Sequence, residues 1–201
     1  MSRWLKIVLV PGVLVLAWIA FVVHSHLTFP SENTPEGAYA RIVLAIAKGR
    51  PRDCFPYLET QAQWASYTIR DYRSKAAARV VESYPETERA ALLVAYEHEA
   101  KALDGADAWL WLAQSRGFVT RLRKDLSGIR KVEIAGERAT VQTARGTRYA
   151  FRKRENGIWG LTMFTAELMA EAEKAARDWD VVQRAADDYA RANAAGGART
   201  Q

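Results

Sequence analysis

The sequence predicts an α+β protein in which several helices pack on a four-stranded antiparallel meander, with a transmembrane helix before them and a long helix after them. Three observations support this class. An uncharged apolar run lies between residues 7 and 23. Apolar residues then recur at helical spacing up to about residue 127, and with the period of two typical of strands from 129 to 164. Beyond residue 165 the helical period returns.

The first 27 residues read as a cytoplasmic N-terminus and a single transmembrane helix. Ile7–Val23 is a run of 17 residues without a charge, close to the roughly 20 residues that cross a bilayer. Arg3 and Lys6 precede the run, which predicts that the N-terminus is cytoplasmic and the rest of the chain extracytoplasmic. The alternative is a cleaved signal peptide, although its apolar core is usually shorter, about 7–15 residues.

The folded part is expected to begin after a short linker at residues 28–33. Thr34 is a good helix N-cap, and Pro35 suits the first helical position. Lys48-Gly49 is expected to end this helix, because glycine readily adopts the left-handed conformation found just after helices.

Three further helical segments are expected before residue 128. The first runs from about residue 53 to residue 83, the second follows Pro85 and stops at Asp104-Gly105, and the third runs from about 107 to 126. Their expected buried positions are, in turn, Leu58, Trp64, Tyr67, Tyr72 and Val80; Leu92, Leu93, Tyr96 and Leu103; and Leu112, Ser115, Val119, Leu122 and Leu126.

Four strands are predicted at residues 129–135, 138–144, 147–154 and 158–164. Short turns separate them, and Asn156-Gly157 is the strongest hairpin signal among these turns. Strands joined by such short turns form an antiparallel meander. Alternation divides the side chains between two faces, and the predicted inward set is Val132, Ile134, Ala139, Val141, Thr143, Tyr149 and Phe151.

The last predicted element is an amphipathic helix over residues 165–193, followed by a disordered tail at 194–201. Thr165 is its expected N-cap. Its apolar seam consists of Leu168, Ala172, Ala175, Trp179, Val182, Ala186 and Tyr189, at steps of four and three. An isolated helix of this length is marginal in water, so the seam must pack either on its own domain or on a second copy. The first option is favoured, because the connection from the last strand is short.

Four features together resemble the NTF2-like superfamily. They are the opening Thr34-Pro35-Glu36, the exit through Lys48-Gly49, the stretch from Val132 to Val141, and the ending Glu155-Asn156-Gly157-Ile158-Trp159. The resemblance covers about residues 34–164 and implies a domain in which helices and a curved antiparallel sheet form a cone. Many bacterial members are anchored or exported and have no known activity, which implies a location at the bacterial inner membrane.

The composition excludes several chemistries. Cys54 is the only cysteine, so no disulfide within the chain and no cysteine-based zinc site can form. His24 and His26 adjoin the apolar run, and His98 lies on a polar stretch of helix without a carboxylate at (i, i+4) spacing. No nucleotide-binding or hydrolase motif is present. We therefore predict no catalytic residue, no metal site and no cofactor.

The positive charge is concentrated in one part of the chain. Residues 116–154 hold twelve Lys or Arg and three acids, a net of +9, whereas residues 165–191 have a net of −3. The candidate residues for an anionic partner are Arg138, Arg145, Arg148, Arg152 and Arg154. The alternative is a solvated sheet face, or pairing with the acidic last helix. Nucleic acid is disfavoured, because the aromatic residues alternate onto the face opposite the arginines.

The predicted function is a single-pass membrane-anchored extracytoplasmic binding or scaffolding protein without catalytic activity. Its partners would be the lipid bilayer, through Ile7–Val23, and an anionic envelope component or protein. One alternative is an NTF2-like hydrolase or isomerase, for which Tyr149 and Glu59 are the available groups. The other is a structural subunit that forms a homodimer through Leu168, Trp179, Val182 and Tyr189.

Overall fold

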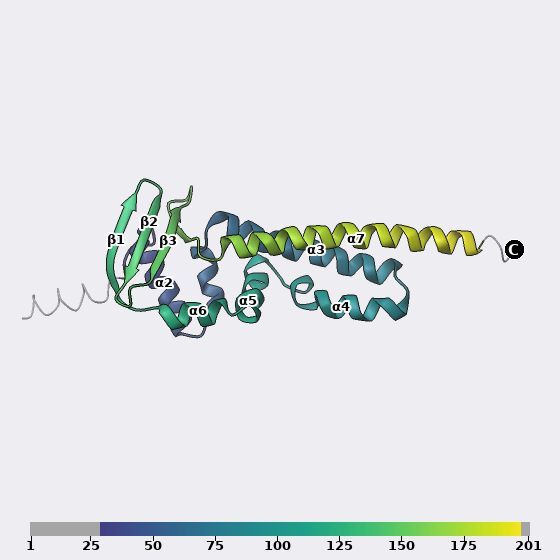
Figure 1. The fold of residues 1–201 in the computed structure, drawn as a ribbon, viewed down its shortest axis with the longest axis horizontal. Helices are drawn as coiled ribbons and strands as arrows, with labels where there is room; N and C mark the ends of the chain where they lie inside the picture. The colour runs from purple at the N-terminus through teal and green to yellow at the C-terminus, as the bar shows by residue number, and fades with distance from the viewer. Residues whose placement is uncertain (1–28, 198–201) are drawn as a thin grey trace, which may run out of the picture.

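The structure, a computed structural model, describes residues 29–197. It is a mixed α+β fold with a long last helix, as the sequence predicts (Figure 1). The elements are, in chain order, α2 (Pro35–Ala47), the 3₁₀-helix η1 (Pro51–Tyr57), α3 (Thr60–Ser83), α4 (Glu86–Ala100), α5 (Gly105–Ser115), α6 (Phe118–Asp125), β1 (Ile129–Ala135), β2 (Arg138–Thr143), β3 (Arg148–Lys153), β4 (Trp159–Leu161) and α7 (Thr165–Gly197).

The four strands form an antiparallel sheet in the order β1-β2-β3-β4, which confirms the predicted meander. Arg138 pairs with Arg152, and Ala139 with Phe151, so the two faces of the sheet alternate as expected. The inward residues on β2 and β3 are buried, including Val141 and Tyr149. On β1 the prediction is wrong for Ile134, which is 57% exposed; β1 is an edge strand, and all of its residues except Val132 are exposed.

A first apolar core, the sheet core, lies between the sheet and the helices around it. It combines residues from α2, η1, α5, α6 and the starts of α3 and α7. Its largest fully buried side chains include Trp109, Tyr149, Phe118, Phe151 and Phe164. Phe118 and Phe164 stack with ring centroids 4.5 Å apart. Bulky aromatic side chains therefore fill the space between sheet and helices.

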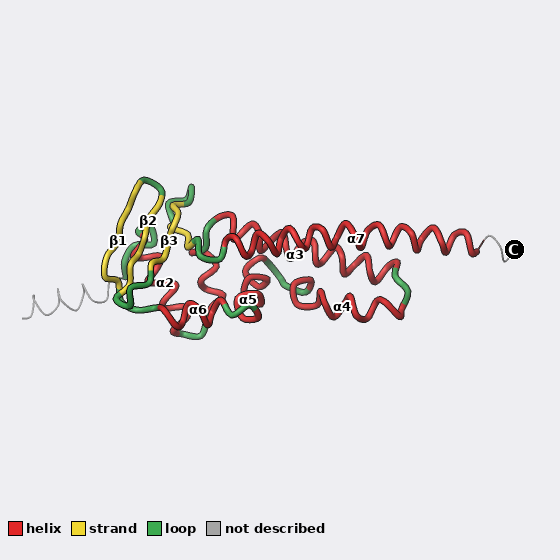
Figure 2. The backbone as a smooth tube through the Cα atoms, in the orientation of Figure 1, coloured by secondary structure: helices red, strands yellow, loops and turns green. Residues whose placement is uncertain are grey.

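A second apolar core, the helical core, lies farther from the sheet, between α3, α4 and α7. α3 and α7 run parallel and side by side, since both start at the sheet and make ion pairs at matching positions along their length (Figure 2). Small residues line their interface: Ala62, Ala65 and Ala76 on α3, and Ala172, Ala175 and Ala186 on α7 are all buried. Alanines let the two backbones approach closely, as the seam of the last helix predicts.

Two predicted helices are divided in the structure. The segment expected from residue 53 to residue 83 is a 3₁₀-helix followed by α3, because Pro56 cannot donate a backbone hydrogen bond within a longer α-helix. The segment expected from 107 to 126 is divided into α5 and α6 at Gly117, whose φ of 70° lies in the left-handed region. The helix after Pro85 ends at Ala100, earlier than predicted.

Several large residues expected in the core lie outside it. Trp64 is 67% exposed, Tyr67 is 44% exposed and Leu103 is 83% exposed. Tyr72 is only partly buried, and Ser115 is exposed. On α3 the buried face is formed instead by alanines together with Ile69 and Val80, so residue size misled the prediction where the close packing of helices requires small side chains.

The predictions for the two ends of the chain are tested only in part. No helix among residues 29–197 is long and apolar enough to cross a membrane, and the predicted transmembrane run Ile7–Val23 lies outside the described residues. At the other end, α7 continues to Gly197, beyond the predicted boundary at residue 193. Of the predicted tail, residues 194–197 are therefore helical, and residues 198–201 lie outside the described part.

Candidate functional site

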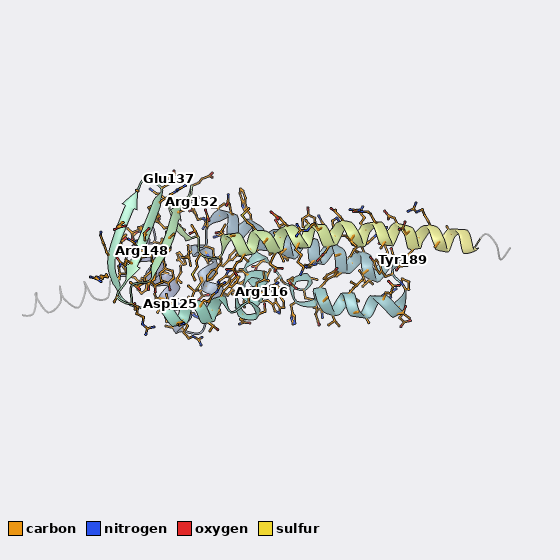
Figure 3. The ribbon with its side chains drawn as sticks, viewed as in Figure 1. Arg116, Asp125, Glu137, Arg148, Arg152 and Tyr189 are labelled. Atoms are coloured by element: carbon orange, nitrogen blue, oxygen red, sulfur yellow. The ribbon has the colours of Figure 1, made fainter. Side chains whose placement is uncertain are left out.

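The five arginines proposed for an anionic partner do not gather at one point. Arg138 and Arg152 are neighbours on the outer face of the sheet, near the β1–β2 turn. Arg148 lies farther along the sheet, opposite Gln142 (Figure 3). Arg145 lies in the β2–β3 turn, where its guanidinium donates to the Lys124 carbonyl. The sheet therefore presents two separate positive regions.

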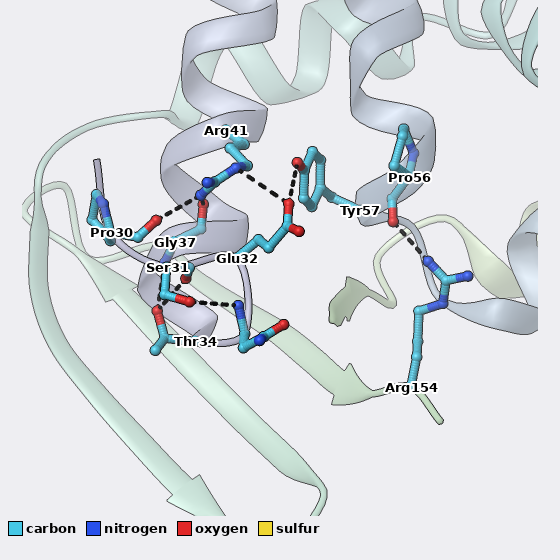
Figure 4. Close-up of polar contacts among 10 residues, drawn as sticks. Pro30, Ser31, Glu32, Thr34, Gly37, Arg41, Pro56, Tyr57 and Arg154 are labelled. Atoms are coloured by element: carbon cyan, nitrogen blue, oxygen red, sulfur yellow. Dashed lines mark hydrogen bonds and ion pairs between the residues drawn. The ribbon is translucent and has the colours of Figure 1, made fainter. Parts of the chain in front are cut away.

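Arg152 and Arg154 are already engaged with groups of the same chain. Arg152 Nη1 lies 2.6 Å from Glu59 Oε1. Arg154 donates to the Pro56 carbonyl at 2.7 Å (Figure 4). It also donates to Gln63 Oε1 at 3.1 Å. Partial burial lowers the pKa of the Arg154 guanidinium below its usual range. Arg138, by contrast, has no ion pair among residues 29–197, and Arg148 has only a long one, 3.7 Å, to Glu133.

Part of the positive charge is neutralised by the last helix, as one of the two sequence interpretations expects. Arg121 Nη2 donates to both carboxylate oxygens of Glu167 at 2.8 Å. Arg116 contacts Glu171, one turn farther along α7. These pairs connect α6 and the end of α5 to the acidic N-terminal half of α7. These pairs do not involve the arginines of the sheet.

Glu59 is the joint between the sheet and the two long helices. It is only 4% exposed, and its Oε2 accepts a hydrogen bond of 2.7 Å from Thr165 Oγ1 at the start of α7. Its backbone N–H donates to the Leu161 carbonyl on β4 at 3.1 Å. Gly160 lies directly beneath, where an added Cβ would be 2.6 Å from Glu59 Cα. One residue thus ties together α3, β3, β4 and α7.

A surface pocket of about 430 Å³ opens beside this joint. Its lining comes from the first residues of α3, the end of β3 and the β3–β4 turn. The lining residues are Glu59, Thr60, Gln61, Trp64, Arg152, Lys153, Arg154, Glu155 and Asn156. The three consecutive basic residues exceed the two acids, and one of these acids is paired with Arg152. We call this feature the basic pocket.

A second hollow, of about 470 Å³, runs between α3 and α7. Its lining is mainly apolar: Gln61, Trp64, Ala65, Thr68, Tyr72, Met169, Ala172, Glu173 and Ala176. We call it the α3–α7 groove. Trp64 and Gln61 line both hollows, so the basic pocket and the groove adjoin at these two residues.

The groups that the sequence offered for catalysis are poorly placed for it. Burial raises the pKa of Tyr149 to about 12 in the sheet core. Burial also raises the pKa of Cys54 to about 12, so its thiolate is not formed near neutral pH. His98 is exposed and stacks on Trp111, with centroids 5.1 Å apart. No cluster of potential metal ligands occurs among residues 29–197.

The proposed packing residues of the last helix face their own chain. Leu168 belongs to the sheet core and Val182 to the helical core, and both are buried. Trp179 and Tyr189 are partly buried against the helical core. Tyr189 also donates to Glu88 Oε2 at 2.7 Å and packs edge-on against Tyr84. The seam is therefore covered by α3 and α4.

The residues just before α2 are bonded to the domain, although the sequence suggests only a linker there. Arg41 Nη1 donates to the Pro30 carbonyl at 2.6 Å and to the Gly37 carbonyl at 3.2 Å (Figure 4). Glu32 lies 3.8 Å from Arg41 Nε and accepts a hydrogen bond of 3.3 Å from the Tyr57 hydroxyl. These contacts hold residues 30–34 against α2 and η1.

Sequence reasoning found the arginines and missed the role of Glu59 and Trp64 beside them. The Glu59–Arg152 pair joins residues far apart in the chain, and no local pattern reports it. The sequence around Trp64 does contain a signal of its position. Trp64 is a large residue among the small residues Ala62, Ala65 and Ser66, which form the closely packed face of its helix. No family model, curated protein or solved structure matches this chain.

Proposed function

We propose that this protein is a membrane-anchored binding module of NTF2-like type, without catalytic activity, that holds an anionic partner outside the cytoplasm. The anchor is the apolar run Ile7–Val23, and the charges before it set the orientation. The binding surface is the outer face of the sheet with the adjoining basic pocket. Aromatic side chains fill the interior of the domain, which supports binding on the outside over chemistry within a hollow cone.

The observation that carries the proposal is the set of exposed cations on the outer sheet face. Arg138 and Arg148 are exposed and lie on the same face of the sheet, and Lys153 is exposed at the end of β3. Exposed charges add little to the stability of a fold. A surface whose exposed cations are unpaired or only loosely paired is therefore suited to attracting an anion, such as a lipid headgroup, an envelope polymer or an acidic protein.

The two alternative functions receive less support from the geometry. An enzyme would need Glu59 or Tyr149 free to react, yet Glu59 is held by Arg152 and Thr165, and Tyr149 is buried. A subunit that assembles through the last helix would need an open seam, yet that seam is covered by α3 and α4.

The test uses the full chain in nanodiscs of neutral phosphatidylcholine. Vesicles that contain phosphatidylglycerol are passed over the immobilised discs, and their retention is measured against discs without protein. Each basic residue near an anionic surface contributes about 1 kcal/mol, so replacing both Arg138 and Arg148 with glutamine should weaken retention about 30-fold. Raising the salt concentration should weaken it further.

The matched control is Arg191→Gln. It removes an exposed positive charge, paired with Asp188, from the far end of α7 and should leave vesicle retention unchanged. No retention by the parent protein, or equal retention by the double variant, would count against the proposed function.

A further inference from the structure

The basic pocket and the α3–α7 groove together form one amphipathic surface. Each hollow alone lies within the roughly 300–1,000 Å³ typical of ligand sites. They meet at Gln61 and Trp64, so a molecule bound across both would have one polar and one apolar end. The proposed binding of an anion by the sheet cations gives a role to the basic pocket but not to the α3–α7 groove. The groove needs an explanation of its own.

The polar end favours an anion. Arg152, Lys153 and Arg154 follow one another at the end of β3 and all line the pocket. The two acids in the lining are Glu59, whose charge Arg152 offsets, and Glu155 on the β3–β4 turn. Lys153 lines the pocket, is exposed and has no ion pair among the described residues. The first backbone amides of α3, at Thr60 and Gln61, point the positive end of a 24-residue helix at the same place.

The apolar end favours a chain rather than a ring. On α3 the groove-lining positions run from Gln61 to Tyr72, about 16 Å of helix at about 1.5 Å per residue. On α7 they are Met169, Ala172, Glu173 and Ala176. The small alanines along the α7 side leave space beside α3, and Met169 is a flexible side chain that adapts to an apolar ligand.

Trp64 marks the boundary between the two ends. Trp64 is 67% exposed and is the largest of the exposed apolar residues between 29 and 197. It lines both hollows. An indole suits such a boundary because it combines a large apolar ring with one polar N–H group, and tryptophan is enriched where lipid headgroups meet acyl chains.

We propose that this surface binds one anionic phospholipid, with the phosphate in the basic pocket and an acyl chain along the α3–α7 groove. The inference rests on the proposed function and names its ligand. Charge complementarity selects the anionic headgroup, and the apolar groove next to the basic pocket selects a ligand that carries an apolar chain. An acidic polymer would fill the pocket and leave the groove empty.

The experiment uses photo-crosslinking, because the protein is tested as the full chain in a lipid environment. Nanodiscs of phosphatidylcholine receive a small fraction of phosphatidylglycerol with a diazirine near the end of one acyl chain. After illumination, peptide mass spectrometry locates the labelled residues. We expect labels on Thr68, Tyr72, Met169 or Ala176, and about fivefold fewer with diazirine-labelled phosphatidylcholine of the same chains.

Three variants test the two ends separately. Lys153→Gln should reduce groove labelling by phosphatidylglycerol about fivefold, because it removes one cation from the headgroup end. Trp64→Ala should reduce it by a similar factor for both lipids. Ala176→Phe fills the groove and should abolish labelling there. The control Leu103→Ala removes another highly exposed apolar side chain, away from the groove, and should change nothing. Circular dichroism confirms that each variant retains its helices.

Failure of the lipid inference can be told apart from failure of the proposed function. Equal groove labelling by neutral and anionic lipids, or labels confined to residues 1–28, would overturn the inference. Vesicle retention through Arg138 and Arg148 is measured independently and would then still decide the proposed function. Groove labelling that survives Ala176→Phe would also overturn the inference, because the lipid chain would have to lie elsewhere.

Discussion

Arg73 is the clearest case of a single residue that holds distant parts of this molecule together. Its side chain is only 7% exposed, on a helix surface where arginine is usually solvated. It lies 2.5 Å from Asp178 on α7, and its guanidinium stacks over the Tyr96 ring on α4 at 4.7 Å. A buried charge is tolerated only when it is paired, so this arginine fixes how α3, α4 and α7 meet.

Glu99 adds a second carboxyl group to this buried cluster. It is 8% exposed, and burial raises the pKa of its carboxyl above the usual range, although nearby Arg73 opposes the shift. A raised pKa means that the folded state favours the protonated form. The contribution of Glu99 to stability is therefore fully present below about pH 4.3, the ordinary glutamate pKa, and is lost as the pH rises through the folded-state pKa.

Replacing Glu99 with glutamine should therefore stabilise the protein at pH 7. The variant keeps the shape of the side chain and removes the cost of burying a charge. We expect a higher thermal midpoint than the parent at pH 7, and a difference that shrinks towards pH 4. The measurement is circular dichroism of the full chain in maltoside micelles over this pH range.

Glu97 supplies the control for that experiment. It lies on the same helix but is exposed, and its hydrogen bond with Lys101 lowers the pKa of its carboxyl. Glu97→Gln should therefore have the opposite sign, a slightly lower midpoint at pH 7. An increase of equal size at all pH values for Glu99→Gln would show that the effect is not one of ionisation.

The sequence predicts single residues well where the determinant is local and poorly where it is not. Alternation placed Tyr149 and Phe151 in the core correctly, because the strand period is independent of the partner. Trp64 was misplaced, since size suggested burial while the partner helix required alanines. The pairs Glu59–Arg152 and Arg73–Asp178 join residues about 100 positions apart, and only the tertiary fold brings them together.

Among the elements, α7 connects both apolar cores. It begins at the Glu59 joint, where Leu168 packs in the sheet core, and then runs along α3 into the helical core with Val182 and Ala186. Its seam therefore has a complete partner within one chain. This packing within one chain determines the expected effect of shortening a side chain of the seam.

Trp179→Ala should destabilise the protein without changing its mass. Trp179 is partly buried against the helical core, so we expect a loss of about 2–3 kcal/mol in the free energy of unfolding, less than for a fully buried tryptophan. Urea unfolding of the full chain in maltoside micelles measures the stability, and light scattering measures the protein mass in the micelle. Val181→Ala, 62% exposed on the same helix, should change stability by less than about 0.5 kcal/mol.

A different outcome would assign α7 to assembly. If the parent protein is a dimer and Trp179→Ala converts it to a stable monomer, the residue packs on a second copy. A change of mass caused by Val181→Ala would point to the opposite face of the helix instead.

Elements were predicted most accurately where end signals are strong. The side chain of Thr34 caps α2 by accepting from the Gly37 amide, as the sequence indicates. Asn156-Gly157 forms a tight turn, with glycine at a φ of 84°. The missed boundaries are those at Pro56 and Gly117, where the helical pattern of apolar residues continues through a backbone break. The two hollows could not be predicted, because they depend on how α3 packs against β3 in one case and against α7 in the other.

The whole molecule is elongated, with the sheet and α2 at one end and the last turns of α7 at the other (Figure 1). The 33 residues of α7 correspond to a length of about 50 Å. Residues 30–34, which follow the predicted anchor, are bonded at the sheet end through Arg41 and the Trp159–Asn33 contact. An anchor that precedes Phe29 would therefore attach the molecule by its sheet end, and α7 would project away from that point.

The anchor itself can be tested by a reporter fused after Gln201. A phosphatase that is active only outside the cytoplasm should be active in this fusion, because Arg3 and Lys6 precede the apolar run. The product should stay in the membrane fraction after washing with salt and carbonate. A shortened, soluble product would favour a cleaved signal peptide, and an inactive reporter would contradict the orientation.

The parallel packing of α3 and α7 has a consequence for the order of folding. The buried face of α3 is completed by a helix that begins about 100 residues later in the chain, so it stays uncovered until almost the whole protein has been synthesised. Such distant contacts slow folding and prolong the exposure of apolar surface. A chain that stops before Thr165 would leave both cores open. The apolar face of α3 that α7 normally covers would then be accessible to chaperones and proteases.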